Sequence, residues 1–173
     1  KVTVFDNSPR QLDQDRFVAE REGLDIKLVE GDMRDLSVFS DASFDLVFPP
    51  VSNLFIHEIR PVWREAYRVL RPGGTLLAGF MNPIFYAFDI EKAEKRELVV
   101  QYKLPYADSE YPEIAEKMIA NGDALEHSHS LTDQLGGQTD AGFAIIGFYE
   151  DHMRNMIISE YTPTYIATRA IKN

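Results

Sequence analysis

The sequence predicts an α/β fold with a mostly parallel sheet and an antiparallel strand at the C-terminal end. Residues 44–79 contain a short apolar run, a loop, an amphipathic helical pattern, a glycine turn and a second apolar run. That order is typical of one right-handed crossover unit of a parallel sheet. Two further apolar runs, 143–149 and 165–171, are joined by a short connection, as antiparallel neighbours are. A purely parallel sheet would not predict this last pair.

Length and composition are those of one globular domain spanning residues 1–173, with 45% hydrophobic and 27% charged residues. The formal net charge of −10 argues against a nucleic-acid partner, because binding to phosphate backbones depends on Lys and Arg. The chain has no cysteine, which removes disulfides, thiolate catalysis and cysteine-based zinc sites. No apolar run approaches the roughly 20 residues that span a bilayer, so we expect no membrane partner and a cytoplasmic location.

The first three predicted elements are a strand, a helix and a strand. Residues 1–5 alternate into a β-branched strand. The Asn-Ser-Pro string at 7–9 is a helix start signal, and Gly23 ends the helix predicted at 11–22. The next predicted strand covers residues 26–29.

Asp6 stands at the carboxyl end of the first predicted strand and has two interpretations. In nucleotide-binding α/β folds, a carboxylate at this position accepts hydrogen bonds from ribose hydroxyl groups. Alternatively, Asp6 merely supports the start of the helix that follows. Position alone does not favour either interpretation.

The crossover unit begins with a predicted buried strand at Leu46–Phe48. Pro49 and Pro50 end it, because neither proline has an N–H group to donate to a strand ladder. The loop 50–53 therefore lies at the carboxyl end of the strand, where ligands bind in open α/β sheets.

A helix is predicted at 59–70, because apolar residues recur there at helical spacing with charged residues between them. Pro61 falls in the first turn, where a missing N–H group does no harm. The string Arg-Pro-Gly-Gly at 71–74 is expected to end the helix, with glycine providing the positive φ of a C-cap. Residues 75–80 form the next predicted buried strand.

The second half of the chain contains a long segment without clear periodicity. Residues 90–98 are helical or extended, and the insertion at about 99–130 contains one candidate helix at 112–120. Long loops without regular structure are usually functional or mobile. A helix at 131–141, interrupted or closed by two glycines, leads into the C-terminal strands.

The string FDLV, then a helix ending in YRVLRPGG, then a strand resembles the class I S-adenosylmethionine-dependent methyltransferases, in which RVLKPGG before the fifth strand recurs. Arg71 in place of lysine is the single departure within that string. The resemblance extends back through VFDNSPRQL and VEGDMRDL and forward to the end of the chain. It implies a Rossmann-like methyltransferase sheet and methyl transfer from S-adenosylmethionine to a small molecule, with the insertion acting as a lid.

The resemblance also implies where the cofactor binds. Asp6 would hold the ribose, Asp32 would accept from the adenine amino group, and Met33 would pack on the adenine ring. The alternative for Asp32 is a surface turn in which it caps a short helix. The cofactor-binding residues expected on this basis are Asp6, Asn7, Asp32, Met33, Pro49 and Pro50.

Catalytic and substrate-binding residues are harder to identify from the sequence. His57 follows the loop 50–53 and is a candidate general base, although the sequence favours the alternative that it caps or flanks the helix that begins near Glu58. His127 and His129 lie two residues apart without a cysteine nearby, so no metal site is expected. The substrate-binding candidates are Ser52, Asn53 and Tyr86, the last from an aromatic segment that lines a pocket or packs in the core.

The family's first strand and glycine-rich loop would precede Lys1, so the resemblance leads us to expect an N-terminally incomplete chain. The sheet would then have unpaired edges, which favour pairing with a second copy as a homodimer. Two alternatives remain for the function. One is a methyltransferase-like fragment that works as a non-catalytic binding module, and the other is a nicotinamide-dependent oxidoreductase, since Asp6 suits that ribose too.

Overall fold

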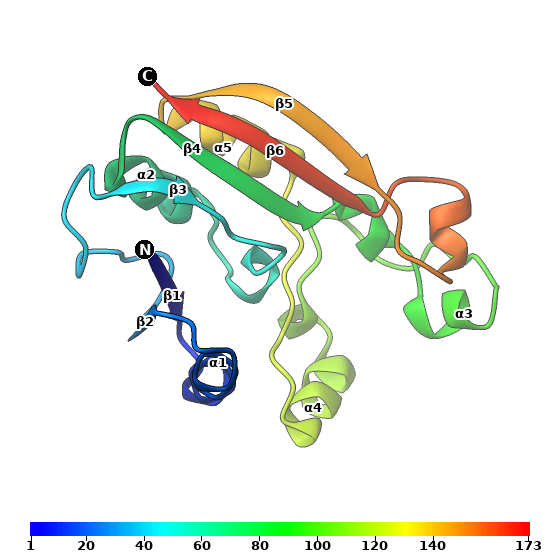
Figure 1. The fold of residues 1–173 in the computed structure, drawn as a ribbon. Coiled ribbons are helices and arrows are strands. Elements are labelled where there is room, and N and C mark those ends of the chain that lie inside the picture. Colours follow the sequence, from blue (N-terminus) through cyan, green and yellow to red (C-terminus); the bar gives the residue numbers. More distant parts are fainter.

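The computed structural model describes all 173 residues, and its strands form two sheets (Figure 1). In the larger sheet β3 (Phe44–Val47) and β4 (Leu70–Met81) are parallel, and β6 (Tyr165–Lys172) runs antiparallel to both β4 and β5 (Phe143–Asp151). The predicted α/β fold with a reversed C-terminal strand is therefore confirmed. The larger sheet has the order β3, β4, β6 and β5, and the smaller sheet pairs β1 (Val2–Asp6) with β2 (Ile26–Glu30) in parallel.

Helix α1 (Pro9–Glu22) packs against β1 and β2 and has the predicted end signals. The Ser8 side chain accepts a hydrogen bond from the Gln11 N–H group at 3.3 Å. Gly23 ends the helix with a φ of 66°, a conformation that costs glycine little. The helix begins two residues earlier than predicted, because Pro9 occupies its first turn.

Helix α2 (Arg60–Val69) covers one face of the larger sheet and supplies the centre of the main core. The predicted glycine C-cap is wrong. The helix ends at Val69, and Leu70 already has an extended ψ of 139° and pairs with Phe44 as the start of β4. The buried residues that α2 contributes are Val62, Trp63, Ala66 and Val69.

Lys172, at the end of β6, takes the place of the missing glycine cap. Its ammonium group donates hydrogen bonds to the carbonyl oxygens of Tyr67 at 2.8 Å and Leu70 at 2.7 Å, and it lies 4.6 Å from the centre of the Tyr67 ring. A cation at a helix C-terminus satisfies free carbonyl groups and interacts favourably with the helix dipole. The end of α2 is thus fixed by a residue about one hundred positions away.

Replacing Lys172 with methionine should lower the free energy of unfolding by about 1–2 kcal/mol, because the α2 carbonyl groups lose a charged donor. Urea unfolding followed by circular dichroism measures the change. Lys103→Met, at an exposed position without an ion pair, is the control and should change stability by less than about 0.5 kcal/mol. Equal stability of the two variants would contradict the capping role.

Strand β3 is less buried than expected. Leu46 is 49% exposed and Phe48 is 61% exposed, because they alternate with Val47, which packs against the main core, and so lie on the other face of the sheet. The two prolines do not stop the pairing with β4 either. The Gly79 N–H group of β4 donates to the Pro49 carbonyl at 3.1 Å, and the Gly79 carbonyl accepts from the Val51 N–H group at 2.9 Å. Neither hydrogen bond requires an N–H group from Pro49 or Pro50, so the prolines do not interrupt this pairing.

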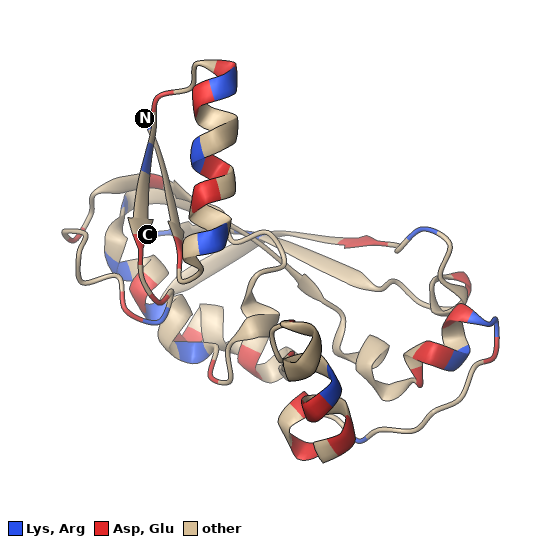
Figure 2. Cartoon of the chain, turned by 90° about the horizontal axis from the view of Figure 1, so that it is seen from below, with Lys and Arg blue, Asp and Glu red and all other residues tan.

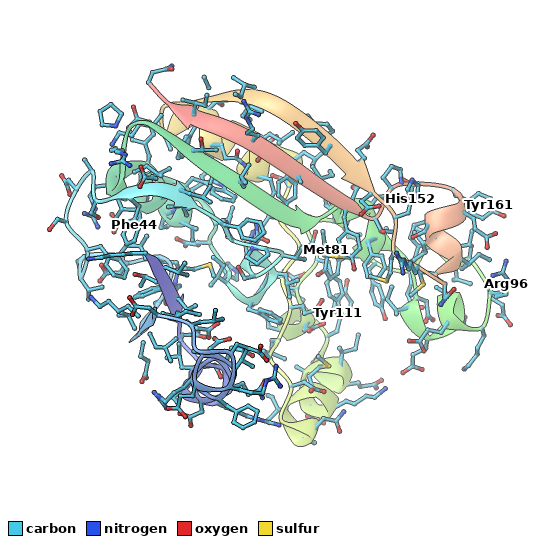
Figure 3. All side chains as sticks on the ribbon, viewed as in Figure 1. Phe44, Met81, Arg96, Tyr111, His152 and Tyr161 are labelled. Carbon is cyan, nitrogen blue, oxygen red and sulfur yellow. The ribbon has the colours of Figure 1, made fainter.

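The insertion 99–130 forms an extended arm with α4 (Pro112–Asn121) at its end (Figure 1). Its two connecting segments run antiparallel, with the Ser128 N–H group donating to the Tyr106 carbonyl at 2.7 Å. Met81 lies at the end of β4 and Tyr111 lies within the arm (Figure 3). Four tyrosines pack against one another at its base, with neighbouring ring centres 4.9–5.6 Å apart, namely Tyr86, Tyr102, Tyr106 and Tyr111.

The remaining helices are short. Helix α3 (Ile90–Glu94) follows the aromatic segment, and a π-helical turn at Thr132–Gly136 continues into α5 (Gly137–Asp140), close to the interrupted helix that the sequence predicts. No helix has the length and apolar character needed to cross a bilayer.

Candidate cofactor and substrate site

Asp6 ends β1 and uses only one of its carboxylate oxygens within the chain. Its Oδ1 atom accepts a hydrogen bond from the Ser8 N–H group at 2.8 Å, which supports the start of α1. The other oxygen, Oδ2, accepts no hydrogen bond from the chain, and the neighbouring Asn7 is exposed. The two interpretations of Asp6 are therefore compatible, because a free carboxylate oxygen remains for a ligand hydroxyl group.

Gly31, directly after β2, is a residue whose role the sequence alone does not reveal. A Cβ atom at this position would lie 2.4 Å from Cζ of Phe5, so any side chain here would displace the Phe5 ring. That ring packs edge-on against Phe39 with centres 5.4 Å apart, and Phe39 packs against Phe44 of β3 at 5.1 Å. These three aromatic rings connect the smaller sheet to the larger one.

Asp32 lies in a turn, with Arg34 beside it. Its Oδ1 atom accepts hydrogen bonds from the Arg34 N–H group at 2.8 Å and from Arg34 Nε at 3.0 Å. The hydrogen bonds from Arg34 hold the pKa of the Asp32 carboxyl below its usual range, so the group is ionised at neutral pH. Its Oδ2 atom accepts from Arg34 Nε at 3.0 Å and from Arg34 Nη2 at 2.5 Å. Arg34 therefore contacts both carboxylate oxygens, and a ligand amino group at Asp32 would share them with Arg34. Met33 packs against the core beneath α2.

Arg68 and Glu65 of α2 make hydrogen bonds with residues 36–39, the segment that follows this turn, and together form what we call the Arg68 clamp. The Arg68 guanidinium donates to the carbonyl oxygens of Leu36 at 2.8 Å and Phe39 at 3.0 Å, and Glu65 Oε2 accepts from the Leu36 N–H group at 2.7 Å. Arg68 also pairs with Glu65 itself and with Asp41. The hydrogen bond from Arg68 lowers the pKa of the Glu65 carboxyl, which keeps this clamp ionised.

The loop after β3 contains an unusual backbone conformation. Val51 has a φ of 55°, a region that β-branched residues rarely adopt and that often marks a functional site. Its N–H group is held by the Gly79 carbonyl. Ser52 is half-buried, and its hydroxyl group makes no hydrogen bond with the chain.

The other two substrate candidates make hydrogen bonds within the protein. Asn53 is 1% exposed, and its Nδ2 atom donates to Gln134 Oε1 at 3.0 Å. The Tyr86 hydroxyl donates to Glu126 Oε2 at 2.8 Å. The Ser52 hydroxyl group therefore has no partner in the chain, whereas Asn53 and Tyr86 each use a side-chain donor within the protein.

The structure brings His57 beside His127, a pairing that the sequence spacing does not signal. Their ring centres are 5.4 Å apart in an edge-to-face arrangement. His129, on the same segment, contacts the Asn53 carbonyl through Nε2 at 3.0 Å, so that nitrogen carries the proton. No group of three or more His, Asp or Glu side chains is arranged to hold a metal ion.

One hollow in the surface lies apart from these residues, and another includes Val51. A groove of about 500 Å³ runs between α1 and the amino half of β2, lined in part by Arg16, Ala19 and Ile26. Another, of about 310 Å³, lies between the ends of β4, β5 and β6, and Val51 and Gly79 line one side of it. The first lies away from the carboxyl ends of the strands, where ligands bind in this class of sheet.

Comparisons with known proteins decide the family. The family described as "Methyltransferase domain" matches residues 1–78. A protein of Bacillus subtilis named as an uncharacterized methyltransferase, YbaJ, is 51% identical over 173 residues, covering 99% of this chain and 68% of that protein. The chain belongs to the class I S-adenosylmethionine-dependent methyltransferases. It is therefore an enzyme whose cofactor is S-adenosylmethionine, and the nicotinamide alternative is set aside.

More distant relatives agree with this family. A sterol 24-C-methyltransferase of Neurospora crassa is 30% identical over 139 residues, covering 77% of this chain and 36% of that protein. The crystal structure of an S-adenosylmethionine-dependent methyltransferase from Mesorhizobium loti has a TM-score of 0.72 at 18% identity, covering 99% of this chain and 80% of that one. The likeness to the Mesorhizobium loti structure shows that this chain has the same fold.

Proposed function

We propose that this methyltransferase binds S-adenosylmethionine at the carboxyl ends of β1, β2 and β3 and methylates a small molecule there. The observation that carries the proposal is the free carboxylate oxygen of Asp6 at the end of β1. The ionised Asp32 and the unpartnered Ser52 hydroxyl also lie just after strand ends. Asp6 suits the ribose hydroxyl groups, Asp32 suits the adenine amino group, and Ser52 suits a polar methyl acceptor.

S-adenosylmethionine supplies a methyl group on a sulfonium, which a nucleophile takes in an in-line displacement. The protein's task in such a reaction is mainly to align the reactants and exclude water. Asp6 and Asn7 hold the ribose, Asp32 and Met33 hold the adenine, and Pro49 and Pro50 border the methyl group. Ser52 contacts the acceptor, while Asn53 and Tyr86 support the walls through Gln134 and Glu126.

The small-molecule acceptor, the lid and the cell location are parts of this proposal. Lys and Arg are interleaved with Asp and Glu along α1 rather than gathered on one face (Figure 2), which does not favour a phosphate backbone as partner. The arm at 99–130 follows the site residues along the chain and serves as the lid over the acceptor. The cytoplasmic location and the homodimer stay predictions.

Replacing Asp6 with asparagine should weaken S-adenosylmethionine binding at least about tenfold, because one charge-assisted hydrogen bond to a hydroxyl group is lost. Asparagine can still accept from the Ser8 N–H group, so the start of α1 is preserved. Isothermal titration with S-adenosylmethionine and S-adenosylhomocysteine measures the change. Asp25→Asn, an exposed change of the same charge, is the control, and equal affinities for the two variants would contradict the ribose role of Asp6.

A further inference from the structure

His57 and His127 come from two segments that meet beside the loop after β3. His57 lies between a short 3₁₀ helix (Asn53–Phe55) and α2, while His127 lies on the returning segment of the arm. The His127 N–H group of the backbone donates to the Leu54 carbonyl at 2.7 Å. The arm is thereby fixed to the loop that borders the proposed methyl site, and the two imidazole rings contact each other there.

His127 has an imidazole nitrogen without a partner. Its Nδ1 atom is buried and makes no hydrogen bond, whereas His129 uses its Nε2 on the Asn53 carbonyl. Burial lowers the pKa of His127, and the neighbouring His57 and His129 lower it further, while Asp108 opposes them. At neutral pH the His127 ring is therefore an uncharged imidazole with a lone pair, the form in which histidine accepts protons.

The other buried titratable groups nearby are less suited to accept a proton. The Glu126 carboxylate already accepts from the Tyr86 hydroxyl at 2.8 Å. Asp108 is 5% exposed and accepts from the Tyr106 hydroxyl and from the Glu126 N–H group, both at 2.7 Å. Both carboxylates thus hold the arm together, and the two histidines remain without such a role.

We propose that the His57–His127 pair is the proton acceptor for the molecule that is methylated. This inference rests on the proposed function. The acceptor's O–H or N–H bond would break, its proton would pass to an imidazole nitrogen of the pair, and the electron pair would stay on the acceptor to form the bond to the methyl carbon. The bond between the methyl carbon and the sulfonium sulfur would break at the same time, and its electron pair would stay on sulfur, which becomes the neutral thioether of S-adenosylhomocysteine. The imidazolium later releases the proton to water, which reaches the exposed His57. The acceptor is accordingly a small molecule with a hydroxyl or protonated amine group at the reacting atom.

The test compares two bound ligands that differ in one charge next to the methyl position. S-adenosylmethionine carries a positive sulfonium, and S-adenosylhomocysteine carries a neutral sulfur. If His127 faces the methyl group, the sulfonium opposes its protonation, and its pKa should be lower by about half a unit or more in the S-adenosylmethionine complex. The imidazole signals of the full chain are followed by NMR between pH 5 and 8, with each ligand at saturation.

Two variants assign the signals and serve as controls. His127→Gln removes the signal that is expected to respond, and His152→Gln removes that of His152. His152 lies beyond the end of β5, with Nδ1 2.8 Å from the Ser159 carbonyl (Figure 3), and its signal should be the same with both ligands. If His127→Gln does not fold, the comparison on the unmodified chain still decides.

The outcomes distinguish a failure of this inference from a failure of the proposed function. A lower pKa of His127 with S-adenosylmethionine alone supports the pair as the group that faces the methyl site. An equal pKa with both ligands bound overturns the inference and leaves the cofactor site intact. If neither ligand binds, the proposed function fails, and the inference fails with it.

Discussion

Replacing Trp63 with alanine is expected to lower the free energy of unfolding by about 3–5 kcal/mol. Trp63 is fully buried at the centre of the core between α2 and the larger sheet. Its indole Nε1 donates to the Asp133 carbonyl at 3.0 Å, and a Cβ atom at Gly137 would lie only 2.6 Å from its ring. The variant would lose the packing of α2, of the π-helical turn and of α5 together.

This loss is a large part of the roughly 5–15 kcal/mol that stabilises a typical domain. Chemical denaturation at several temperatures measures it, since the variant is expected to be partly unfolded near 37 °C. Phe17→Ala, on the outer face of α1 where the ring is 64% exposed, is the control for removal of an aromatic ring. A loss below about 1 kcal/mol for Trp63→Ala would show that the core does not centre on this residue.

Replacing Arg68 with methionine should lower the free energy of unfolding by about 2–3 kcal/mol and also weaken S-adenosylmethionine binding. The methionine side chain keeps much of the packing volume but leaves the carbonyl groups of Leu36 and Phe39 without their Arg68 donor, and Glu65 keeps only its hydrogen bond from the Leu36 N–H group. Asp32 and Met33 lie just before the clamped segment, so the turn proposed to hold adenine loses its support.

Denaturant unfolding and calorimetric titration measure the two effects separately. Arg10→Met, at an exposed position of α1 without an ion pair, is the matched control and should change neither. Lower stability with unchanged cofactor affinity would mean that the Arg68 clamp supports the fold without positioning the site.

The parts of the fold that depend on neighbouring residues could be predicted from the sequence. The serine cap, Pro9 and Gly23 specify α1 locally, and the reversed C-terminal pair follows from two apolar runs with a short connection. The predicted glycine C-cap of α2 is wrong. The helix ends at Val69, and Lys172, which is distant in sequence, donates to the carbonyl groups at its end. Leu46 and Phe48 were expected to be buried, but burial depends on which elements cover each face of the sheet, and they lie on the face opposite Val47 and the main core.

The candidate site divides in the same way. The residues at strand ends, such as Asp6 and Asp32, could be located because a strand end is visible in the sequence. The pairing of His57 with His127 and the clamp by Arg68 could not, because both depend on contacts between segments that lie far apart in the chain. In the sequence, Arg68 cannot be distinguished from any other charged residue on the outer face of a helix, because the loop that it binds is distant in the chain.

The most direct test of the cofactor site is to map amide NMR shifts while S-adenosylmethionine is added to the chain. We predict that the amide signals of residues 6–8, 31–34 and 51–53 change, because these segments follow the carboxyl ends of β1, β2 and β3. Changes confined to Arg16, Ala19 and Ile26, which line the groove between α1 and β2, would contradict the proposed site and place the cofactor at the opposite end of the strands.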